Sequence, residues 1–247
     1  MEHAARVHRT DAEQVTAGAG LDVGPQQGRI FPLHPSRSSP RLKRQSDGAA
    51  ASFAARAPRV SEFLIRLLDI VGSLAILVLS LPVMLVSALL IKITSPGPVF
   101  YRQERVGQGG RLFTLCKFRT MVNDAEKHVG PVWASREDDR VTSVGRILRR
   151  MRIDELPQIY NVLRGDMSLV GPRPERPFFV ERHQALQGVR LAVRPGLTGL
   201  AQVRSFYDLK PNHKVRYDYL YIQNRCFLLN VYILLQTIPV LFAKKGW

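Results

Sequence analysis

The chain has 247 residues and a mass of 27.9 kDa, a length that favours one catalytic domain plus a tail and leaves little room for two enzyme domains. Its 36 lysines and arginines against 20 aspartates and glutamates give a formal charge of +16, which requires an anionic partner such as nucleic acid, lipid or a phosphorylated substrate. The two cysteines, Cys116 and Cys226, lack the spacing of a zinc or redox site, so we expect reduced thiols in a cytosolic compartment.

The first segment, residues 1–57, is rich in Gly, Ser, Ala, Pro, Gln and Arg and shows no sustained hydrophobic period. Such a segment cannot bury enough apolar surface to offset the entropy of ordering, so we predict a disordered basic tail. No apolar stretch typical of a secretory signal falls within its first thirty residues.

A membrane segment is predicted at residues 58–95, because the run 70–91 carries no charge and about 20 apolar residues are enough to cross a bilayer as a helix. Pro82 lies near the middle of the run, where we expect it to kink the helix. Positive residues, which favour the cytoplasmic side, crowd both ends of the run, with Arg66 before it and Lys92 after it. This pattern favours a re-entrant hairpin that enters and leaves one leaflet. An ordinary kinked span is the alternative.

The remaining residues, 96–247, are predicted to form a compact cytoplasmic catalytic domain. Short strands joined by a glycine-rich turn at 107–110 indicate a small β-hairpin, and residues 141–152 and 156–163 are predicted helices. From Lys214 the chain is aromatic and apolar, which is typical of helices that pack on the domain or lie at the membrane interface. The expected fold class is α+β and mainly helical.

Two adjacent carboxylates, Asp154 and Glu155, precede Pro157 at a predicted helix start. Inside a helix such neighbours would point about 100° apart, given 3.6 residues per turn. Proline is tolerated only in the first turn, so Asp154 should lie near the N-cap, where free N–H groups favour negative charge and can also hold a phosphate. Taken alone, the pair is also explained by an acidic cap without catalytic function.

Several cations surround this pair in the sequence. Lys117 and Arg119 are two residues apart on a predicted strand, so they should share one face that could grip a diphosphate or could be solvated. Arg149 belongs to an arginine-rich helix that precedes the pair. Prolines on both sides of Arg173 stiffen its loop, which suits phosphate recognition by the guanidinium. A later glycine-rich loop begins at Arg194 and adds neutral hydrogen-bonding groups, including Gln202.

Four motifs stand in the order found in the bacterial sugar transferase family, the monotopic polyprenyl-phosphate phosphoglycosyl transferases. They are KFRTM at 117–121, DELPQ at 154–158, GDMSLVGPRP at 165–174 and VRPGLTG at 193–199. The chain resembles this family from Arg66 to its C-terminus. Its single membrane segment is similar to the minimal members, which lack the four-span N-terminal region of the larger ones.

The resemblance implies that Asp154 is the nucleophile, which takes the sugar phosphate from a UDP-sugar and releases UMP, and that Glu155 assists it. It also implies Mg²⁺ held by Asp154 and substrate phosphates. Arg149 and Arg173 match phosphate-binding positions, and Lys117 should lie near the metal and carboxylates. The expected acceptor is polyprenyl (undecaprenyl) phosphate in the bacterial inner membrane, with the catalytic domain on its cytoplasmic face. The sequence leaves open whether the protein forms a homodimer.

The chain departs from the family pattern at two places. Leu81 precedes Pro82 where minimal relatives carry serine, and Ser80 is the candidate to replace that hydroxyl. Relatives also carry an Asn-Gly-Arg-like or Ser-Gly-Arg-like triplet after Ala-Gln-Val, whereas this chain reads Arg204-Ser205-Phe206. Arg204 is therefore the candidate to supply that cation from a shifted position.

Two other functions would account for part of the sequence. A membrane-tethered nucleic-acid-binding protein would use the positive charge, but the sequence contains no fingerprint of such a protein and the acidic pair would stay unexplained. A non-catalytic membrane scaffold would keep the apolar run but would tolerate changes of the carboxylates. We therefore expect lipid and phosphorylated partners, and no nucleic acid.

Overall fold

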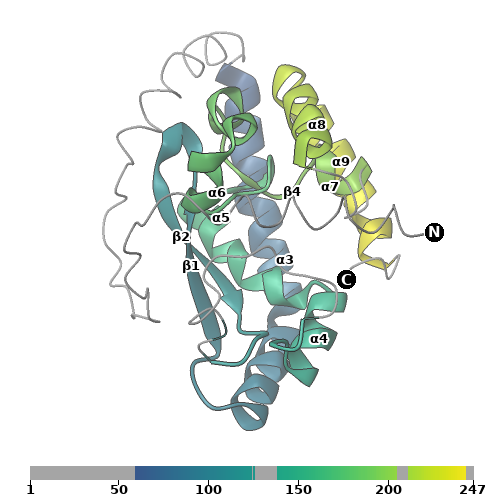
Figure 1. The fold of residues 1–247 in the computed structure, drawn as a ribbon. Helices are drawn as coiled ribbons and strands as arrows, with labels where there is room; N and C mark the ends of the chain where they lie inside the picture. The colour runs from purple at the N-terminus through teal and green to yellow at the C-terminus, as the bar shows by residue number, and fades with distance from the viewer. Residues whose placement is uncertain (1–58, 124, 126–137, 205–210, 243–247) are drawn as a thin grey trace, which may run out of the picture.

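The computed structural model describes residues 59–123, 125, 138–204 and 211–242, so the predicted tail at 1–57 lies outside the described residues. This part of the chain is mostly helical (Figure 1). In chain order, its elements are α3 (Arg59–Thr94), β1 (Phe100–Val106), η1 (Gln108–Gly110), β2 (Leu112–Phe118), α4 (Ser143–Arg150), η2 (Ile153–Gln158), α5 (Ile159–Arg164), β3 (Ser168–Val170), α6 (Pro177–Arg182), η3 (Gln184–Leu186), η4 (Gly188–Leu191), β4 (Gly196–Thr198), α7 (Leu200–Arg204), α8 (Pro211–Gln223) and α9 (Phe227–Phe242).

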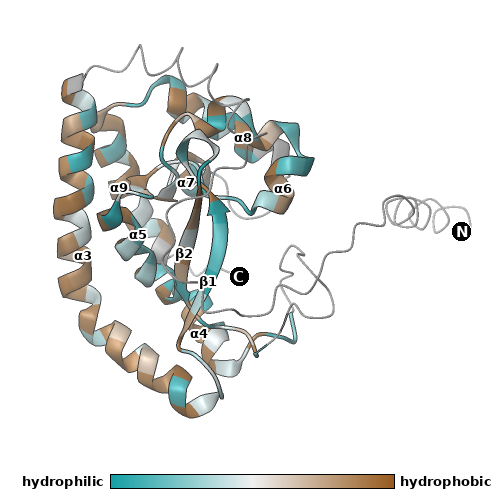
Figure 2. Ribbon diagram, turned by 90° about the vertical axis from the view of Figure 1, so that its left-hand side faces the viewer, coloured by the Kyte–Doolittle hydropathy of each residue, from teal (hydrophilic) through white to brown (hydrophobic). Residues whose placement is uncertain are grey.

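The apolar run forms one long helix, α3, which is long and apolar enough to cross a membrane. Pro82 lies inside α3, and Figure 2 shows a bend along the helix, in agreement with the predicted kink. The hydroxyl of Ser80 lies 3.5 Å from the carbonyl of Leu77, whereas the carbonyl that proline frees belongs to Val78. Ser80 therefore does not satisfy the carbonyl that Pro82 frees.

Both ends of α3 pack on the same globular domain. Near the start, the buried carboxylate of Asp69 accepts hydrogen bonds of 2.8 Å from the Ser168 hydroxyl and the Leu169 N–H of β3. Near the other end, Ile91 packs in a buried cluster with Phe118 and Leu148. One face of α3 is therefore docked along the domain, and the opposite face is exposed and apolar.

The predicted hairpin is confirmed: β1 and β2 pair antiparallel, from Phe100 opposite Phe118 to Val106 opposite Leu112. A second, parallel pair of β3 and β4 was not predicted. It brings Gly171 against Gly196 so closely that a Cβ on Gly171 would lie 2.5 Å from the Arg194 carbonyl oxygen. The loop that carries Arg173 is therefore fixed by backbone contact at its start.

The main core lies between β2, α5, β3 and α9, where Val162, Met167 and Ile233 are fully buried. In Figure 1 the β1–β2 hairpin stands on one side of the molecule, and α8 and α9 stand on the other. Leu228 and Leu235 on α9 stay exposed, which gives this helix an outward apolar face. Both cysteines are free, as expected.

Candidate active site

The two carboxylates lie on η2, a 3-10 helix packed against strand β2. The prediction that Asp154 lies near the N-cap is confirmed: the N-cap is Arg152, whose φ of 55° is left-handed, and Asp154 falls in the first turn after it. The predicted helix 156–163 is divided, because η2 ends at Gln158 and α5 follows it. The tight turn at Arg152 reverses the chain, so η2 folds back toward α4.

Glu155 is held between two cations from distant parts of the chain. Its Oε1 accepts hydrogen bonds from Lys117 Nζ at 3.0 Å and Arg173 Nη2 at 2.5 Å. Burial by itself would raise the pKa of Glu155, but the charges of Arg173 and Lys117 outweigh it and hold the pKa well below its usual range. Glu155 is therefore a fixed anion that orients both cations.

The Asp154 carboxylate differs from that of Glu155 in both its pKa and its partners. Its side chain is 9% exposed, and burial, followed by the charge of Glu155, raises its pKa to about 6. Within the described residues, no hydrogen bond or ion pair ties down its carboxylate. The nearby charges of Lys117, Arg149 and Arg173 still favour its ionised form. Asp154 is thus the carboxylate that is free to react.

Arg149 is placed beside Asp154 by the packing of α4. Its Nε donates to the Thr120 hydroxyl at 2.8 Å, and its charge interacts with that of Asp154. Helix α4 is capped by Thr142, whose hydroxyl accepts the Gly145 N–H. A Cβ on Gly145 would lie 2.1 Å from the Thr120 carbonyl oxygen, so only glycine allows this close approach.

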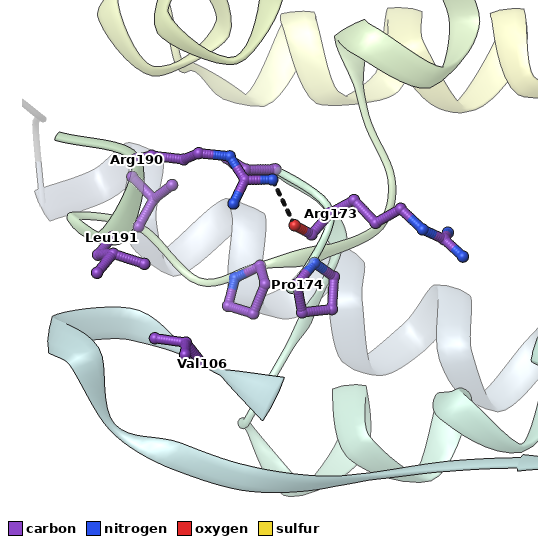
Figure 3. A pocket seen from close by; sticks show the side chains of 9 residues that line it. Val106, Arg173, Pro174, Arg190 and Leu191 are labelled. Atoms are coloured by element: carbon purple, nitrogen blue, oxygen red, sulfur yellow. Dashed lines mark hydrogen bonds between the residues drawn. The ribbon is translucent and has the colours of Figure 1, made fainter. Parts of the chain in front are cut away.

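The loop of Arg173 is held by a buried ion pair that the sequence did not predict. Arg190 on η4 donates from Nε to Asp218 on α8 at 2.8 Å and from Nη2 to the Arg173 carbonyl at 2.6 Å. Figure 3 shows that carbonyl turned toward Arg190 while the Arg173 guanidinium extends the other way. No local pattern marks Arg190 or Asp218, because their partners are distant in sequence.

The other predicted phosphate ligands lie elsewhere. Arg119 directly follows β2, and its guanidinium donates to the Ser95 and Pro96 carbonyls at 2.8 and 2.7 Å and to the Ser95 hydroxyl. It therefore stabilises the turn after α3, whereas Lys117 binds Glu155. The phosphate-binding role of Arg119 stays a prediction.

Three further predicted residues also lie apart from the acidic pair. The charged neighbours of Arg194 include Arg66 and Asp69 near the start of α3. Burial, and to a smaller extent the charge of Arg66, lowers the pKa of Arg194. Arg204 donates to the Tyr232 hydroxyl at 2.9 Å. Both side-chain polar atoms of Gln202 are buried without a partner in the described part of the chain. Their phosphate-binding roles stay predictions.

A metal ion would find few protein ligands here. No group of three or more His, Cys, Asp or Glu side chains converges within the described residues. Glu155 is already engaged by two cations, so Asp154 is the carboxylate that can accept a metal. This donor set fits Mg²⁺, which retains several waters and is commonly bound through one or two carboxylates together with substrate phosphates.

The family model and the most similar known proteins agree on one family for this chain. Residues 60–244 match the model of the family described as bacterial sugar transferase. The UDP-N-acetylgalactosamine-undecaprenyl-phosphate N-acetylgalactosaminephosphotransferase of Aeromonas hydrophila is 44% identical over 190 residues, which cover 74% of this chain and 45% of that protein. The UDP-glucose:undecaprenyl-phosphate glucose-1-phosphate transferase of Caulobacter vibrioides is 44% identical over 73% of this chain and 70% of its own length.

A third relative is close to this chain in extent. The exopolysaccharide production protein ExoY of Rhizobium meliloti is 34% identical, over 85% of this chain and 96% of its own length. The chain therefore spans less than half of the Aeromonas relative but nearly all of the Rhizobium one. Because the family model covers three quarters of the sequence and these relatives agree with it, the chain belongs to the bacterial sugar transferase family.

Proposed function

We propose that the protein transfers a sugar 1-phosphate from a UDP-sugar to polyprenyl (undecaprenyl) phosphate, which starts a surface glycan. The observation that carries the proposal is the opposite state of two adjacent carboxylates: Glu155 is bound by two cations, and Asp154 is buried, uncommitted and raised in pKa to about 6. A covalent mechanism requires such a free carboxylate beside fixed cations. The relatives from Aeromonas hydrophila and Caulobacter vibrioides are named for transfer from a UDP-sugar to undecaprenyl phosphate, which supports the same substrates.

In the proposed reaction an oxygen of Asp154 attacks the phosphorus attached to the sugar. The bond from that phosphorus to the bridging oxygen breaks, UMP leaves with the bonding electrons, and an aspartyl-phosphosugar remains. An oxygen of polyprenyl phosphate then attacks the same phosphorus and releases the Asp154 carboxylate. Arg149 and Arg173 stabilise charge on the phosphoryl oxygens, while Glu155 keeps Lys117 and Arg173 in place.

Mg²⁺ is part of this proposal. Asp154 would hold it together with substrate phosphates, and when bound it would neutralise charge on those phosphates. The cations of the chain would also neutralise charge on a phosphate bound at Asp154, because Lys117, Arg149 and Arg173 all interact with Asp154 through their charges.

The membrane arrangement that we propose is re-entrant. Asp69 near one end of α3 and Ile91 near the other end contact the same domain, and that domain cannot lie on both sides of a bilayer. The cations at both ends of α3 favour placing both ends on the cytoplasmic side, so that α3 enters and leaves the inner leaflet of the bacterial inner membrane. This placement brings the site to a lipid-anchored acceptor.

The activity is tested with protein in detergent, Mg²⁺, polyprenyl phosphate and a panel of UDP-sugars. We expect UMP release with one or more of the sugars and, without the acceptor, a protein adduct whose added mass is that of the sugar phosphate. Asp154→Asn should abolish both signals, and Asp139→Asn, which removes an exposed carboxylate, should not. Full activity of Asp154→Asn would refute the assignment of the nucleophile.

The topology is tested by labelling single cysteines in a background with Cys116→Ser and Cys226→Ser. Val60→Cys and Ile93→Cys place thiols on exposed positions at the two ends of α3. In sealed inner-membrane vesicles of known orientation, a membrane-impermeant maleimide should label both positions from the cytoplasmic side. Labelling from opposite sides would establish a spanning helix instead.

A further inference from the structure

A small hollow beside Glu155 contains polar groups to which the proposed reaction gives no role. Its free space takes about one water-sized group. Its walls are formed by Arg105, Leu115, Lys117, Gln158, Arg173 and Pro174. Lys117 and Arg173 are the two cations that hold Glu155, so the hollow adjoins the acidic pair directly.

Two of the residues that line this hollow each carry a buried donor without an acceptor among the described residues. Gln158 is only 2% exposed, and its Nε2 is buried without a hydrogen-bond partner in the part of the chain that the structure describes. The Nε of Arg105 is buried and unpaired there as well, while its Nη1 and Nη2 donate to the Pro174 carbonyl and the Gln103 side chain. Buried donors are almost always paired, because leaving one unpaired costs free energy. Two such donors on one hollow indicate an acceptor that binds from outside.

The charges around the hollow favour an anionic acceptor. Arg105, Lys117 and Arg173 line it, and none of its lining residues is acidic. Glu155 meets two of these cations, and Glu175 lies 3.9 Å from Arg105. Both carboxylates lie outside the lining, so the lining itself carries an excess of positive charge. Burial keeps this excess poorly screened by water, and it lowers the pKa of Arg105 to about 10.

We propose that the hollow is a subsite for one non-bridging phosphoryl oxygen, with the Gln158 amide as its neutral donor and Arg105 and Arg173 as its charged donors. This inference rests on the proposed function, because it assigns part of the substrate to the site. The oxygen comes either from the nucleoside diphosphate or from the polyprenyl phosphate, which share the same chemistry. Gln158 follows Asp154 by four residues on η2, so one rigid element carries both the nucleophile and this donor.

The test replaces the amide by a group of similar shape that donates nothing, Gln158→Met. Without ligand, we expect its melting temperature to equal or exceed that of the wild type, because an unpaired buried donor is removed. Binding of UDP or of a short-chain polyprenyl phosphate should weaken about ten- to hundredfold, the loss of a hydrogen bond to a charged group. Binding of uridine, which has no phosphate, should not change.

A charged variant and its control sharpen the result. Gln158→Glu should weaken phosphate binding further, because a carboxylate would face the anion. Gln223→Glu makes the same change at an exposed position of α8 and should leave binding unchanged. Weakened binding of UDP alone assigns the oxygen to the nucleotide, and weakened binding of polyprenyl phosphate alone assigns it to the acceptor.

Two outcomes would overturn the subsite. Unchanged affinity of Gln158→Met for both phosphorylated ligands would show that the hollow holds only water. A lowered melting temperature of the ligand-free variant would show that the amide is structural. The proposed function fails separately, if the wild type releases no UMP from any UDP-sugar. In that case weakened UDP binding by Gln158→Met would still establish the subsite.

Discussion

Replacing the proposed nucleophile should make the protein more stable. Ionised Asp154 is disfavoured by burial and by Glu155, so its pKa rises from 3.8 to about 6. The folded protein therefore binds the proton more tightly than the unfolded chain does. The resulting penalty is absent below about pH 3.8, grows as the pH rises, and is complete above about pH 6.

The structure sets the size of this effect. Each tenfold change in an ionisation equilibrium is worth about 1.4 kcal/mol, so the penalty at pH 8 is about 3 kcal/mol. Asn has a similar shape and does not ionise, and Asp154 makes no hydrogen bond within the described residues that the substitution would break. Asp154→Asn should therefore raise the melting temperature at pH 8 by roughly 6 to 12 °C. Roughly half of the gain in free energy should remain at pH 5.

The assay is thermal unfolding of both proteins in the same detergent at pH 5 and pH 8, alongside UMP release. Asp139→Asn removes one negative charge at an exposed position and should shift neither melting temperature by more than about 1 °C. An Asp154→Asn protein that is inactive but no more stable at pH 8 would refute the assignment of a strained, buried carboxylate.

Four further predictions follow from other contacts. The rate of adduct formation should rise about tenfold from pH 5 to pH 7, because only ionised Asp154 attacks; a flat pre-steady-state profile would contradict this. Arg190→Gln should cost about 3–5 kcal/mol of unfolding free energy, because it leaves Asp218 buried without its partner, and should lower kcat more than it raises KM. Arg119→Gln should lower the melting temperature but leave KM for the UDP-sugar unchanged, since its donors meet the turn at Ser95. Gly145→Ala should lower both stability and kcat by pushing α4 away from Thr120, as measured by thermal unfolding and steady-state kinetics.

Sequence patterns predicted the parts of the fold that depend on local chemistry. The uncharged run gave α3, and the turn between apolar segments gave the β1–β2 hairpin. The parallel pair β3–β4 has three residues in each strand, which is too short for an alternating pattern to appear. Its register depends on contact between Gly171 and Gly196, and these lie far apart along the chain.

The residues of the candidate site were also predicted from sequence, but their ionisation states were not. Motif residues indicated the acidic pair, and the structure does bring Lys117 and Arg173 onto Glu155. Neighbouring carboxylates look alike in sequence, however. Their opposite pKa shifts arise from burial and from which of them the cations touch, so neither state could be predicted from the adjacent residues.

The membrane helix and the site are parts of one hydrogen-bonded structure. Asp69 of α3 accepts the Leu169 N–H of β3, and β3 leads within a few residues to Arg173 on Glu155. Without α3, that buried N–H and the Ser168 hydroxyl would lose their acceptor, which would weaken the strand that carries the loop. The globular domain is therefore not independent of α3. Binding and kinetic measurements need the whole helix, held in detergent or lipid, for the geometry of Arg173 to be preserved.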